Sequence, residues 1–385
     1  MNRQLEQARD CVGQGVAAID TPALVIDLDA MERNLARMAA FAAEHGLRLR
    51  PHAKMHKSAE LAKLQMTHGA VGVCVQKTDE ALALVHAGVH DIFISNEVIA
   101  PHKLARLAEA VRDLPARLAI AVDSALGIER LAQALDAAGV RTVGAIDVFI
   151  EIDVGQGRCG AVPGEPAVAL ARQIATHPAL RFAGLQAYHG SAQHQRTPAE
   201  RRRSIESATQ AVVGTRDALA AAGYSVPLVT GAGTGSFVQE TASGLWGELQ
   251  AGSYLFMDAD YAANQNDADD PVFEHALFVK SQVMSRSEDR AVCDAGHKSH
   301  AIDSGLPSVA WPSGLVFANG GDEHGILRAA VPGTEVPELG ETVWLIPGHC
   351  DPTVNLHDVC VGVRGGLAAG RVERLIRVDA RGKLG

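Results

Sequence analysis

Paired cysteines, long apolar runs and an excess of basic residues are all missing from this 385-residue sequence. Its six cysteines are scattered without a CxxC pair, which in so long a chain is typical of reduced thiols and a cytoplasmic protein. No apolar run approaches the roughly 20 residues of a membrane-spanning helix, and residues 1–10 are too polar for a secretory signal. The net charge of −10 leaves no basic stripe for phosphates, which argues against a general nucleic-acid-binding protein.

The apolar segments that are present predict an α/β fold. Hydrophobic residues make up 47% of the chain, enough for a large core. From about residue 46 to 260, nearly continuous apolar strands alternate with amphipathic helices, as expected for parallel strands buried on both faces. Eight such units in succession favour a closed (β/α)8 barrel of the TIM type over an open sheet. The predicted strands are 47–53, 71–76, 91–95, 118–123, 147–153, 182–188, 227–231 and 249–254.

The alternation of strands and amphipathic helices ends after about residue 265, which predicts a second, mostly β domain. Short apolar runs divided by Gly and Pro turns take its place. These runs are 276–283, 290–294, 342–346, 359–363 and 370–378. A further strand at 23–28, followed by a helix at 29–45, precedes the barrel strands, and the pattern alone does not assign it to either domain.

Lys54 lies in the segment Arg50–Lys57, between a proline and two histidines, where the first predicted barrel strand gives way to a helix. Parallel barrels place their chemistry at these strand ends. A lysine held there beside cationic neighbours can lose its proton and form a Schiff base with a carbonyl group. The alternative is a basic turn on the surface.

Two glycine-rich turns follow neighbouring strands of the predicted barrel. The backbone N–H groups of Gly231–Ser236 can cradle an anion, helped by the hydroxyl groups of this turn, and Gly252–Tyr254 has similar chemistry. Either one could also be a simple tight turn. Together with a lysine at another strand end, the two turns match pyridoxal 5′-phosphate, which has a phosphate and an aldehyde.

Other polar residues are expected at the same end of the barrel, where the C-terminal ends of the strands meet. Gln76 and Tyr188 end two further strands, and Arg158 follows the strand 147–153 in a glycine-rich loop. Near a pyridine nitrogen, an arginine would keep that nitrogen unprotonated, because two cations repel; the alternative is a solvated arginine on a mobile loop. His194 lies just beyond Tyr188 and is a candidate general base.

His349 and Asp351 are candidate metal ligands. In an extended conformation both side chains project to one face and Cys350 to the other. An imidazole and a carboxylate suit Mn²⁺, Mg²⁺ or Co²⁺, whereas Cys350 as the ligand would favour Zn²⁺. A simple loop interaction is the alternative, and the crowding of polar residues in 349–358 favours the metal. The polar turn 322–325 is a further candidate for the active site.

Several segments together resemble the D-threonine aldolase and D-serine dehydratase family, whose fold is that of alanine racemase. The matching segments run in order over nearly the whole chain: 21–25, 51–54, 151–160, 186–190, 233–236, 248–254, 322–325 and 349–358. This resemblance implies that the strand 23–28 belongs to the β domain. The implied domains are a barrel at 30–262 and a β domain formed by 1–29 and 263–385.

The resemblance also implies roles for single residues. Lys54 would carry the cofactor, His194 would be the base, and His349 and Asp351 would hold the metal, with Mn²⁺ the favoured ion. The implied cofactor contacts are Lys54, Gln76, Arg158, Tyr188, Gly233, Thr234, Gly252, Ser253 and Tyr254. It further implies a homodimer, in which the second domain of one chain completes the site of its partner.

The implied reaction follows from Asp351. Family members that cleave a carbon–carbon bond carry His-x-Asp at the metal, whereas the dehydrating members tend to carry His-x-Cys. The expected substrate is therefore a small D-3-hydroxy-α-amino acid such as D-threonine, D-allo-threonine or D-phenylserine, cleaved to glycine and an aldehyde. Segments 61–65 and 380–383 also resemble D-3-hydroxyaspartate aldolases. Three rival hypotheses are β-elimination by a D-serine or D-threo-3-hydroxyaspartate dehydratase, racemisation, and a non-enzymatic protein that carries the cofactor.

Overall fold

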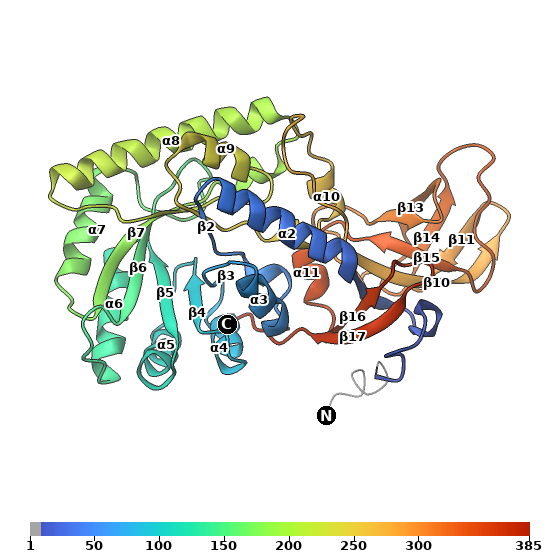
Figure 1. Cartoon of the computed structure of the whole chain (residues 1–385), viewed down its shortest axis with the longest axis horizontal. Helices are drawn as coiled ribbons and strands as arrows, with labels where there is room; N and C mark the ends of the chain where they lie inside the picture. Colours follow the sequence, from blue (N-terminus) through green and yellow to red (C-terminus); the bar gives the residue numbers. More distant parts are fainter. Residues whose placement is uncertain (1–8) are drawn as a thin grey trace.

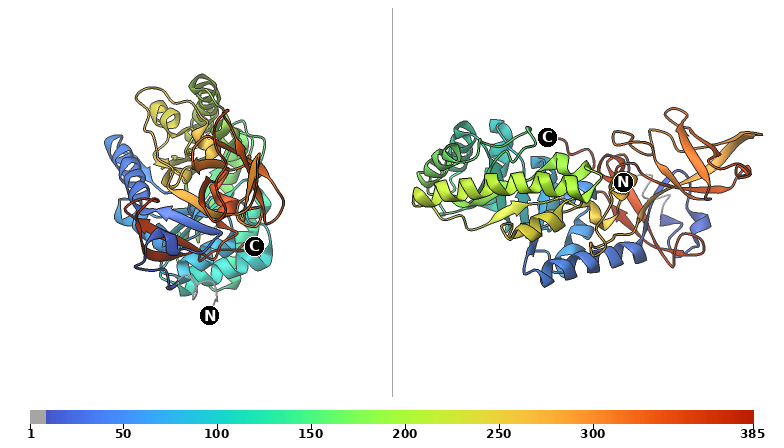
Figure 2. Two further views of the ribbon diagram at one scale, coloured as in Figure 1. Left: turned by 90° about the vertical axis from the view of Figure 1, so that its right-hand side faces the viewer. Right: turned by 90° about the horizontal axis from the view of Figure 1, so that it is seen from above.

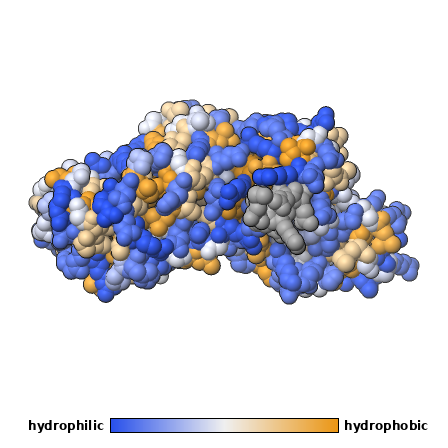
Figure 3. Space-filling model, turned by 90° about the horizontal axis from the view of Figure 1, so that it is seen from below, coloured by the Kyte–Doolittle hydropathy of each residue, from blue (hydrophilic) through white to orange (hydrophobic). Residues whose placement is uncertain are grey.

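The computed structural model describes residues 9–385 and contains two sheets, one toward each end of an elongated molecule (Figures 1 and 2). Most of the polar segment 1–10 therefore lies outside the described residues. No helix in residues 9–385 is long and apolar enough to cross a membrane. The face in Figure 3 is mostly hydrophilic, with small apolar groups between the polar residues. Cys74, Cys159, Cys293, Cys350 and Cys360 are free thiols.

The first sheet is a parallel barrel of eight strands. These are β2 (Arg48–Leu49), β3 (Val73–Val75), β4 (Asp91–Ile94), β5 (Arg117–Val122), β6 (Ile146–Glu151), β7 (Leu180–Ala187), β8 (Val229–Gly231) and β9 (Glu248–Leu249). They pair in the order β2-β9-β8-β7-β6-β5-β4-β3. The sheet closes where the N–H groups of Val71 and Cys74 donate to the carbonyl groups of Leu49 and Pro51, both at 2.9 Å. The predicted barrel is confirmed.

Helices surround the barrel on its outer side (Figure 1). They are α2 (Leu28–Glu44), α3 (Ala59–Thr67), α4 (Thr78–His86), α5 (Pro101–Asp113), α6 (Ala125–Ala137), α7 (Glu165–Ala175), α8 (Pro198–Ala221) and α9 (Phe237–Ser243). Alternate strand residues such as Val73 and Val75 pack against the helices, while Cys74 lies in a second apolar cluster with Phe93 and Phe149. The rings of Phe93 and Phe149 are 4.7 Å apart between centroids.

The second sheet forms the β domain. Its strands are β1 (Ala23–Asp27), β10 (Leu277–Ser287), β11 (Arg290–Cys293), β12 (Ser308–Trp311), β13 (Leu315–Asn319), β14 (Gly325–Ala329), β15 (Thr342–Ile346), β16 (Val359–Arg364) and β17 (Arg371–Arg377). Strand β1 pairs antiparallel with β10 and parallel with β16, so it belongs to this sheet, as the resemblance implies. Strands β12, β13 and β14 were not predicted. The domain boundaries at residues 30 and 262 stay a proposal.

Short helical turns replace extended backbone at two predicted places. The strand predicted at 249–254 ends at Leu249, and Ser253–Leu255 forms the 3-10 turn η4. His349 lies in extended backbone, with φ −146° and ψ 127°, but Asp351 does not, because it lies in the short helix α11 (Cys350–Val354). The extended conformation predicted through Asp351 is therefore wrong from Cys350 onward, where the N–H group of Cys350 donates to the Asp258 carboxylate at 3.0 Å instead of pairing with a strand.

Gly184 provides a test of the packing between β7 and β8. Its φ is +143°, and a Cβ atom there would lie 1.9 Å from the carbonyl oxygen of Leu228. We expect Gly184→Ala to lower the free energy of unfolding by about 1–3 kcal/mol through overpacking, measured by urea unfolding. Gly214→Ala is the matched control, because Gly214 lies in α8 with no atom near its absent Cβ; it should stabilise by about 0.5–1 kcal/mol. Equal effects would contradict the packing argument.

Candidate active site

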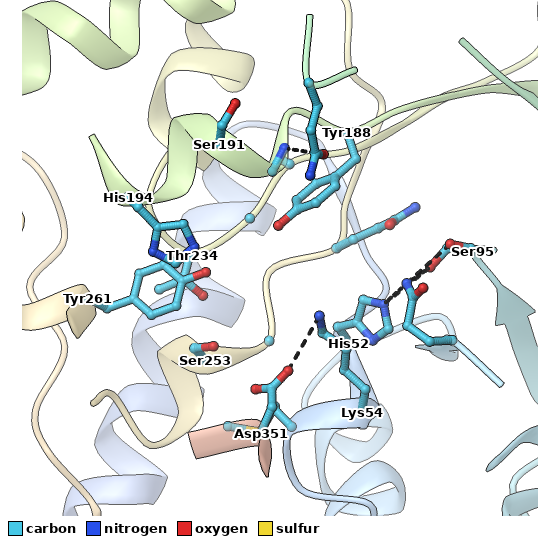
Figure 4. Close-up of a pocket in the computed structure, with 18 of the residues that line it drawn as sticks. His52, Lys54, Ser95, Tyr188, Ser191, His194, Thr234, Ser253, Tyr261 and Asp351 are labelled. Carbon is cyan, nitrogen blue, oxygen red and sulfur yellow. Dashed lines mark hydrogen bonds and ion pairs between the residues drawn. The ribbon is translucent and has the colours of Figure 1, made fainter. Parts of the chain in front are cut away.

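A cavity of about 410 Å³ lies at the C-terminal ends of the barrel strands, next to α11 of the β domain (Figure 4). Every predicted site residue except Tyr254 lines it. These residues are Lys54, Gln76, Arg158, Tyr188, His194, Gly233, Thr234, Gly252, Ser253, His349 and Asp351. The predicted amine and the predicted metal ligands therefore share one cavity, although they come from different domains.

Lys54 lies in the 3-10 turn η2 (Ala53–Met55), directly after the first barrel strand. Its Nζ atom is 3.4 Å from Oδ2 of Asp351. Burial alone would lower the pKa of the Lys54 amine, but the Asp351 carboxylate and Tyr188 outweigh burial, and the pKa is raised. The nearest charged partner of Lys54 is thus an anion, Asp351, and not one of the cationic neighbours that the sequence suggested.

His52 lines the cavity beside Lys54 and was not predicted as a site residue. Its Nε2 atom lies 2.9 Å from Nε2 of Gln76 and 3.2 Å from Oγ of Ser95. Burial lowers the pKa of His52 well below its usual value, and Lys54 lowers it further. The imidazole is therefore neutral and accepts at Nε2, which leaves the proton on Nδ1, a buried atom without a hydrogen-bond partner.

Arg158 is held at the cavity by an ordered loop. The Asp153 carboxylate accepts hydrogen bonds from the N–H groups of Gly155 at 2.9 Å and Gly157 at 3.0 Å. Both glycines have positive φ, which the turn requires. The guanidinium carbon of Arg158 lies 5.6 Å from the centre of the Tyr188 ring. The guanidinium group of Arg158 therefore lies over the ring of Tyr188, in the geometry of a cation–π contact.

The two glycine-rich turns meet at the cavity and offer bare backbone. A Cβ atom at Gly233 would lie 2.3 Å from the Gln193 side-chain oxygen, and one at Gly252 would lie 2.8 Å from the His52 carbonyl oxygen. The turns are joined because the N–H group of Tyr254 donates to Oγ1 of Thr234 at 3.0 Å. Glycine is therefore required at both positions by close packing, and the backbone of both turns lines the cavity, where N–H groups can bind a small anionic group.

Tyr254 is the one predicted cofactor contact whose side chain points elsewhere. The 3-10 turn directs it into an apolar core, where it is fully buried. Its hydroxyl group lies 3.3 Å from Nε2 of Gln65. Only the backbone of Tyr254 therefore contributes to the glycine-rich turns.

His349 and Asp351 form a corner of the cavity that fits a divalent cation. Nε2 of His349 is 3.9 Å from Oδ1 of Asp351, and this oxygen is buried without a hydrogen-bond partner. Nδ1 of His349 lies 2.6 Å from Asp303, so the Asp303 carboxylate leaves Nε2 free for a metal. Burial would lower the pKa of His349, but the carboxylates of Asp351 and Asp303 outweigh burial and raise it. The same negative charge would favour a bound cation.

The same corner supplies only two protein ligands. No group of three or more His, Cys, Asp or Glu residues within the described 9–385 could hold a metal. The Cys350 thiol is buried and directed at the carbonyl oxygen of Met257, 3.6 Å away, so it is not free to act as a ligand instead. A cation here would complete its coordination with water or substrate, as ions with oxygen-rich coordination do.

His194 stands across the cavity from Lys54, at the end of the 3-10 turn η3 (Gly190–His194) (Figure 4). Its Nδ1 atom lies 2.6 Å from Oδ2 of Asp260, and its ring centroid is 5.9 Å from that of Tyr261. About half of the imidazole is exposed. It therefore combines access to a ligand with a fixed orientation, which a general base needs.

Sequence reasoning missed several lining residues. They are His52, Met55, Ser95, Gln156, Gln186, Gly190, Ser191, Gln250 and Tyr261. Gln186 and Gln250 lie at or just after strand ends, so the strand-end argument could have found them. Tyr261 has no such signal, because it lies in a four-residue helix, α10 (Ala259–Ala262). The predicted turn 322–325 does not line the cavity; it connects β13 to β14, and Glu323 pairs with Lys298 at the surface.

Comparison with known proteins agrees with this architecture. The model of the alanine racemase N-terminal domain matches residues 26–260, and that of a serine dehydratase domain matches residues 276–363. A D-threonine aldolase of an Arthrobacter species is 45% identical over 372 residues, which are 96% of this chain and 95% of the relative. A 3-hydroxy-D-aspartate aldolase of Paracoccus denitrificans is 41% identical over 377 residues, 96% of this chain and 94% of the relative.

A solved structure is equally similar. The crystal structure of D-threonine aldolase from Filomicrobium marinum superimposes with a TM-score of 0.91 at 48% sequence identity, covering 96% of this chain and 98% of that one. Because these matches extend over nearly the full length, they include both the barrel and the β domain. The chain therefore belongs to the family that joins an alanine racemase N-terminal domain to a serine dehydratase domain, and that includes D-threonine aldolases.

Proposed function

We propose that this protein is an aldolase that cleaves D-3-hydroxy-α-amino acids between Cα and Cβ, giving glycine and an aldehyde. The observation that carries the proposal is the 3.4 Å approach of Lys54 Nζ to Asp351 Oδ2 within one cavity. It places an amine that can form an imine beside a carboxylate that can hold a metal. The similarity to D-threonine aldolase over 96% of the chain supports the same reaction.

Membership in this family implies pyridoxal 5′-phosphate, which when bound supplies a carbonyl group for an amine and a ring that accepts an electron pair. Lys54 offers the amine. We assign the phosphate to the turns around Gly233 and Gly252, whose backbone lines the cavity. Arg158 would face the ring nitrogen and, as a permanent cation, keep it unprotonated.

We assign the divalent cation to His349 and Asp351, with Mn²⁺ favoured over Mg²⁺ or Co²⁺. When bound, such an ion supplies a positive charge that lowers the pKa of a neighbouring hydroxyl group. His194 is the proposed base, with Nε2 accepting the proton of the substrate C3 hydroxyl. Its other nitrogen is already engaged by Asp260.

A second candidate differs only in the substituent on Cβ. The 41% identity to a 3-hydroxy-D-aspartate aldolase supports an acidic substrate such as D-3-hydroxyaspartate. A dehydratase lacks support at the metal site, because the second ligand position holds Asp351 and not the cysteine of dehydrating members. The homodimer, the cytoplasmic location and the identity of the metal stay predictions.

The cofactor assignment can be tested at Lys54. We expect Lys54→Ala to abolish both aldol cleavage and the visible absorbance of bound pyridoxal phosphate, because no amine remains to bind its carbonyl group. The matched control is Lys63→Ala, since Lys63 is exposed and donates only to the carbonyl oxygen of Ala87. Unchanged absorbance in Lys54→Ala would assign the cofactor to another residue.

The metal assignment can be tested by chelation. Treatment with EDTA should abolish cleavage while the visible absorbance persists, because the cofactor carbonyl group is assigned to Lys54 and not to His349 or Asp351. Added Mn²⁺ should restore activity, and Asp351→Asn should weaken this recovery because it removes the anionic ligand. Full activity after exhaustive EDTA treatment would show that the proposed metal role is wrong.

The reaction class can be tested from its products. With Mn²⁺, D-threonine, D-phenylserine and D-3-hydroxyaspartate should each yield glycine and one equivalent of aldehyde, whereas metal-depleted protein should release neither product. Ammonia and a 2-oxo acid without glycine would identify a dehydratase instead. Loss of optical rotation without cleavage would identify a racemase, and a bound cofactor without any turnover would support a binding protein.

A further inference from the structure

A buried carboxylate stands behind the proposed base. The Asp260 side chain is 8% exposed, and its Oδ2 atom lies 2.6 Å from Nδ1 of His194. Its other oxygen, Oδ1, accepts a hydrogen bond from Nη2 of Arg196. Each oxygen of Asp260 therefore has its own partner, and the carboxylate cannot rotate without breaking both contacts.

Arg196 keeps this carboxylate in place and ionised. Its Nη1 atom donates to the backbone carbonyl oxygen of Asp260 and to Oδ1 of Asn264, both at 2.7 Å. Burial would raise the pKa of Asp260, but hydrogen bonds from Arg196 and His194 outweigh burial and lower the pKa. An ionised carboxylate only accepts hydrogen bonds.

The tautomer of His194 follows from this contact. Because Asp260 can only accept, Nδ1 of a neutral His194 must carry the proton, and Nε2 then has a free lone pair. The ring of Tyr261 packs beside the imidazole at 5.9 Å between centroids and further restricts its orientation. Figure 4 shows both rings on the same wall of the cavity.

The short helix α10, which carries Asp260, also holds the segment that contains the two proposed metal ligands, His349 and Asp351. The Asp258 carboxylate accepts hydrogen bonds from the N–H groups of Tyr261 and Cys350, each at 3.0 Å. The N–H group of Ala259 donates to the carbonyl oxygen of Pro347 at 2.9 Å. The short helix α10 therefore fixes the position of His194 relative to His349 and Asp351, which flank Cys350.

We propose that Asp260 is a positioning residue that holds His194 in the tautomer whose Nε2 faces the cavity and accepts a proton. The inference rests on the proposed role of His194 as the base of the aldol cleavage. Asp260 does not line the cavity and acts through the imidazole that does. The arrangement follows the general rule that a carboxylate on one imidazole nitrogen sets the protonation of the other.

Asp260→Asn tests this role with almost no change in volume. Arg196 would retain the amide oxygen, because a guanidinium can only donate. The amide NH₂ group would then face Nδ1 of His194 and move the imidazole proton to Nε2, where it blocks proton acceptance. We expect kcat to fall by about 10²–10⁴-fold, the range for losing a general base, with little change in KM or in cofactor absorbance.

Two further variants separate positioning from folding. Asp267→Asn is the matched control, because Asp267 pairs with Arg202 at the surface and both side chains are half exposed; its activity should equal that of the wild type. Adding Arg196→Met to Asp260→Asn frees the amide to turn its oxygen toward His194. The double variant should therefore regain part of the kcat lost in Asp260→Asn.

The deciding readout is the protonation of the His194 ring, measured from its ¹⁵N chemical shifts by NMR and assigned with His194→Asn. Wild-type protein should carry the proton on Nδ1, and Asp260→Asn should carry it on Nε2. An unchanged tautomer in Asp260→Asn, or wild-type kcat despite a changed tautomer, would overturn the proposal. Failure of the wild type to release glycine would instead overturn the proposed function, and it would leave the tautomer result intact.

Discussion

The approach of Lys54 to Asp351 joins the two domains at the cavity, yet this ion pair does not hold them together. The Lys54 side chain is 40% exposed, and pairs of this kind contribute about 0–1 kcal/mol. The domains are instead joined by an apolar cluster that contains Met55 and Leu255 from the barrel mouth and Val354 from the β domain. Burying each such side chain contributes about 1.5–3 kcal/mol. Apolar packing therefore sets how the two domains meet at the cavity, and the ion pair between Lys54 and Asp351 is a consequence of that packing.

Carboxylates behind the cavity organise three of its functional elements. Asp303 and Asp260 each approach Nδ1 of a histidine at 2.6 Å, which directs Nε2 of His349 and His194 toward the cavity. Asp153 orders the loop of the cavity arginine through two backbone N–H groups. In each case a carboxylate that does not line the cavity fixes the orientation of a group that does. The cavity residues can therefore be arranged before any ligand arrives, which reduces the free-energy cost of binding.

The sequence predicted the barrel side of the site better than the rest, for a topological reason. Parallel strands bring their C-terminal ends to one mouth, so Lys54, Gln76 and Tyr188 could be grouped without knowing any contact. No such rule connects the barrel to the β domain, and the resemblance alone implied that His349 and Asp351 join them. Asp260 gave no signal, because a four-residue helix has no periodic pattern. Strands β12–β14 were also missed; they are as short as β11 and β15, which were predicted, but a smaller share of their residues is buried.

The identity of the base can be argued from the surroundings of the titratable groups that line the cavity. Burial raises the pKa of Tyr188, and it raises that of Tyr261 well above the usual range, so both phenols stay protonated near neutral pH. His52 is neutral, but its Nε2 already accepts from Gln76 and its Nδ1 carries the proton. Apart from the proposed metal ligands His349 and Asp351, two candidates remain: Lys54, which the cofactor needs, and His194. Of the residues that line the cavity, only His194 combines a free nitrogen, exposure to the cavity and a carboxylate that fixes its ring, so it is the group best suited to take a proton from a substrate hydroxyl.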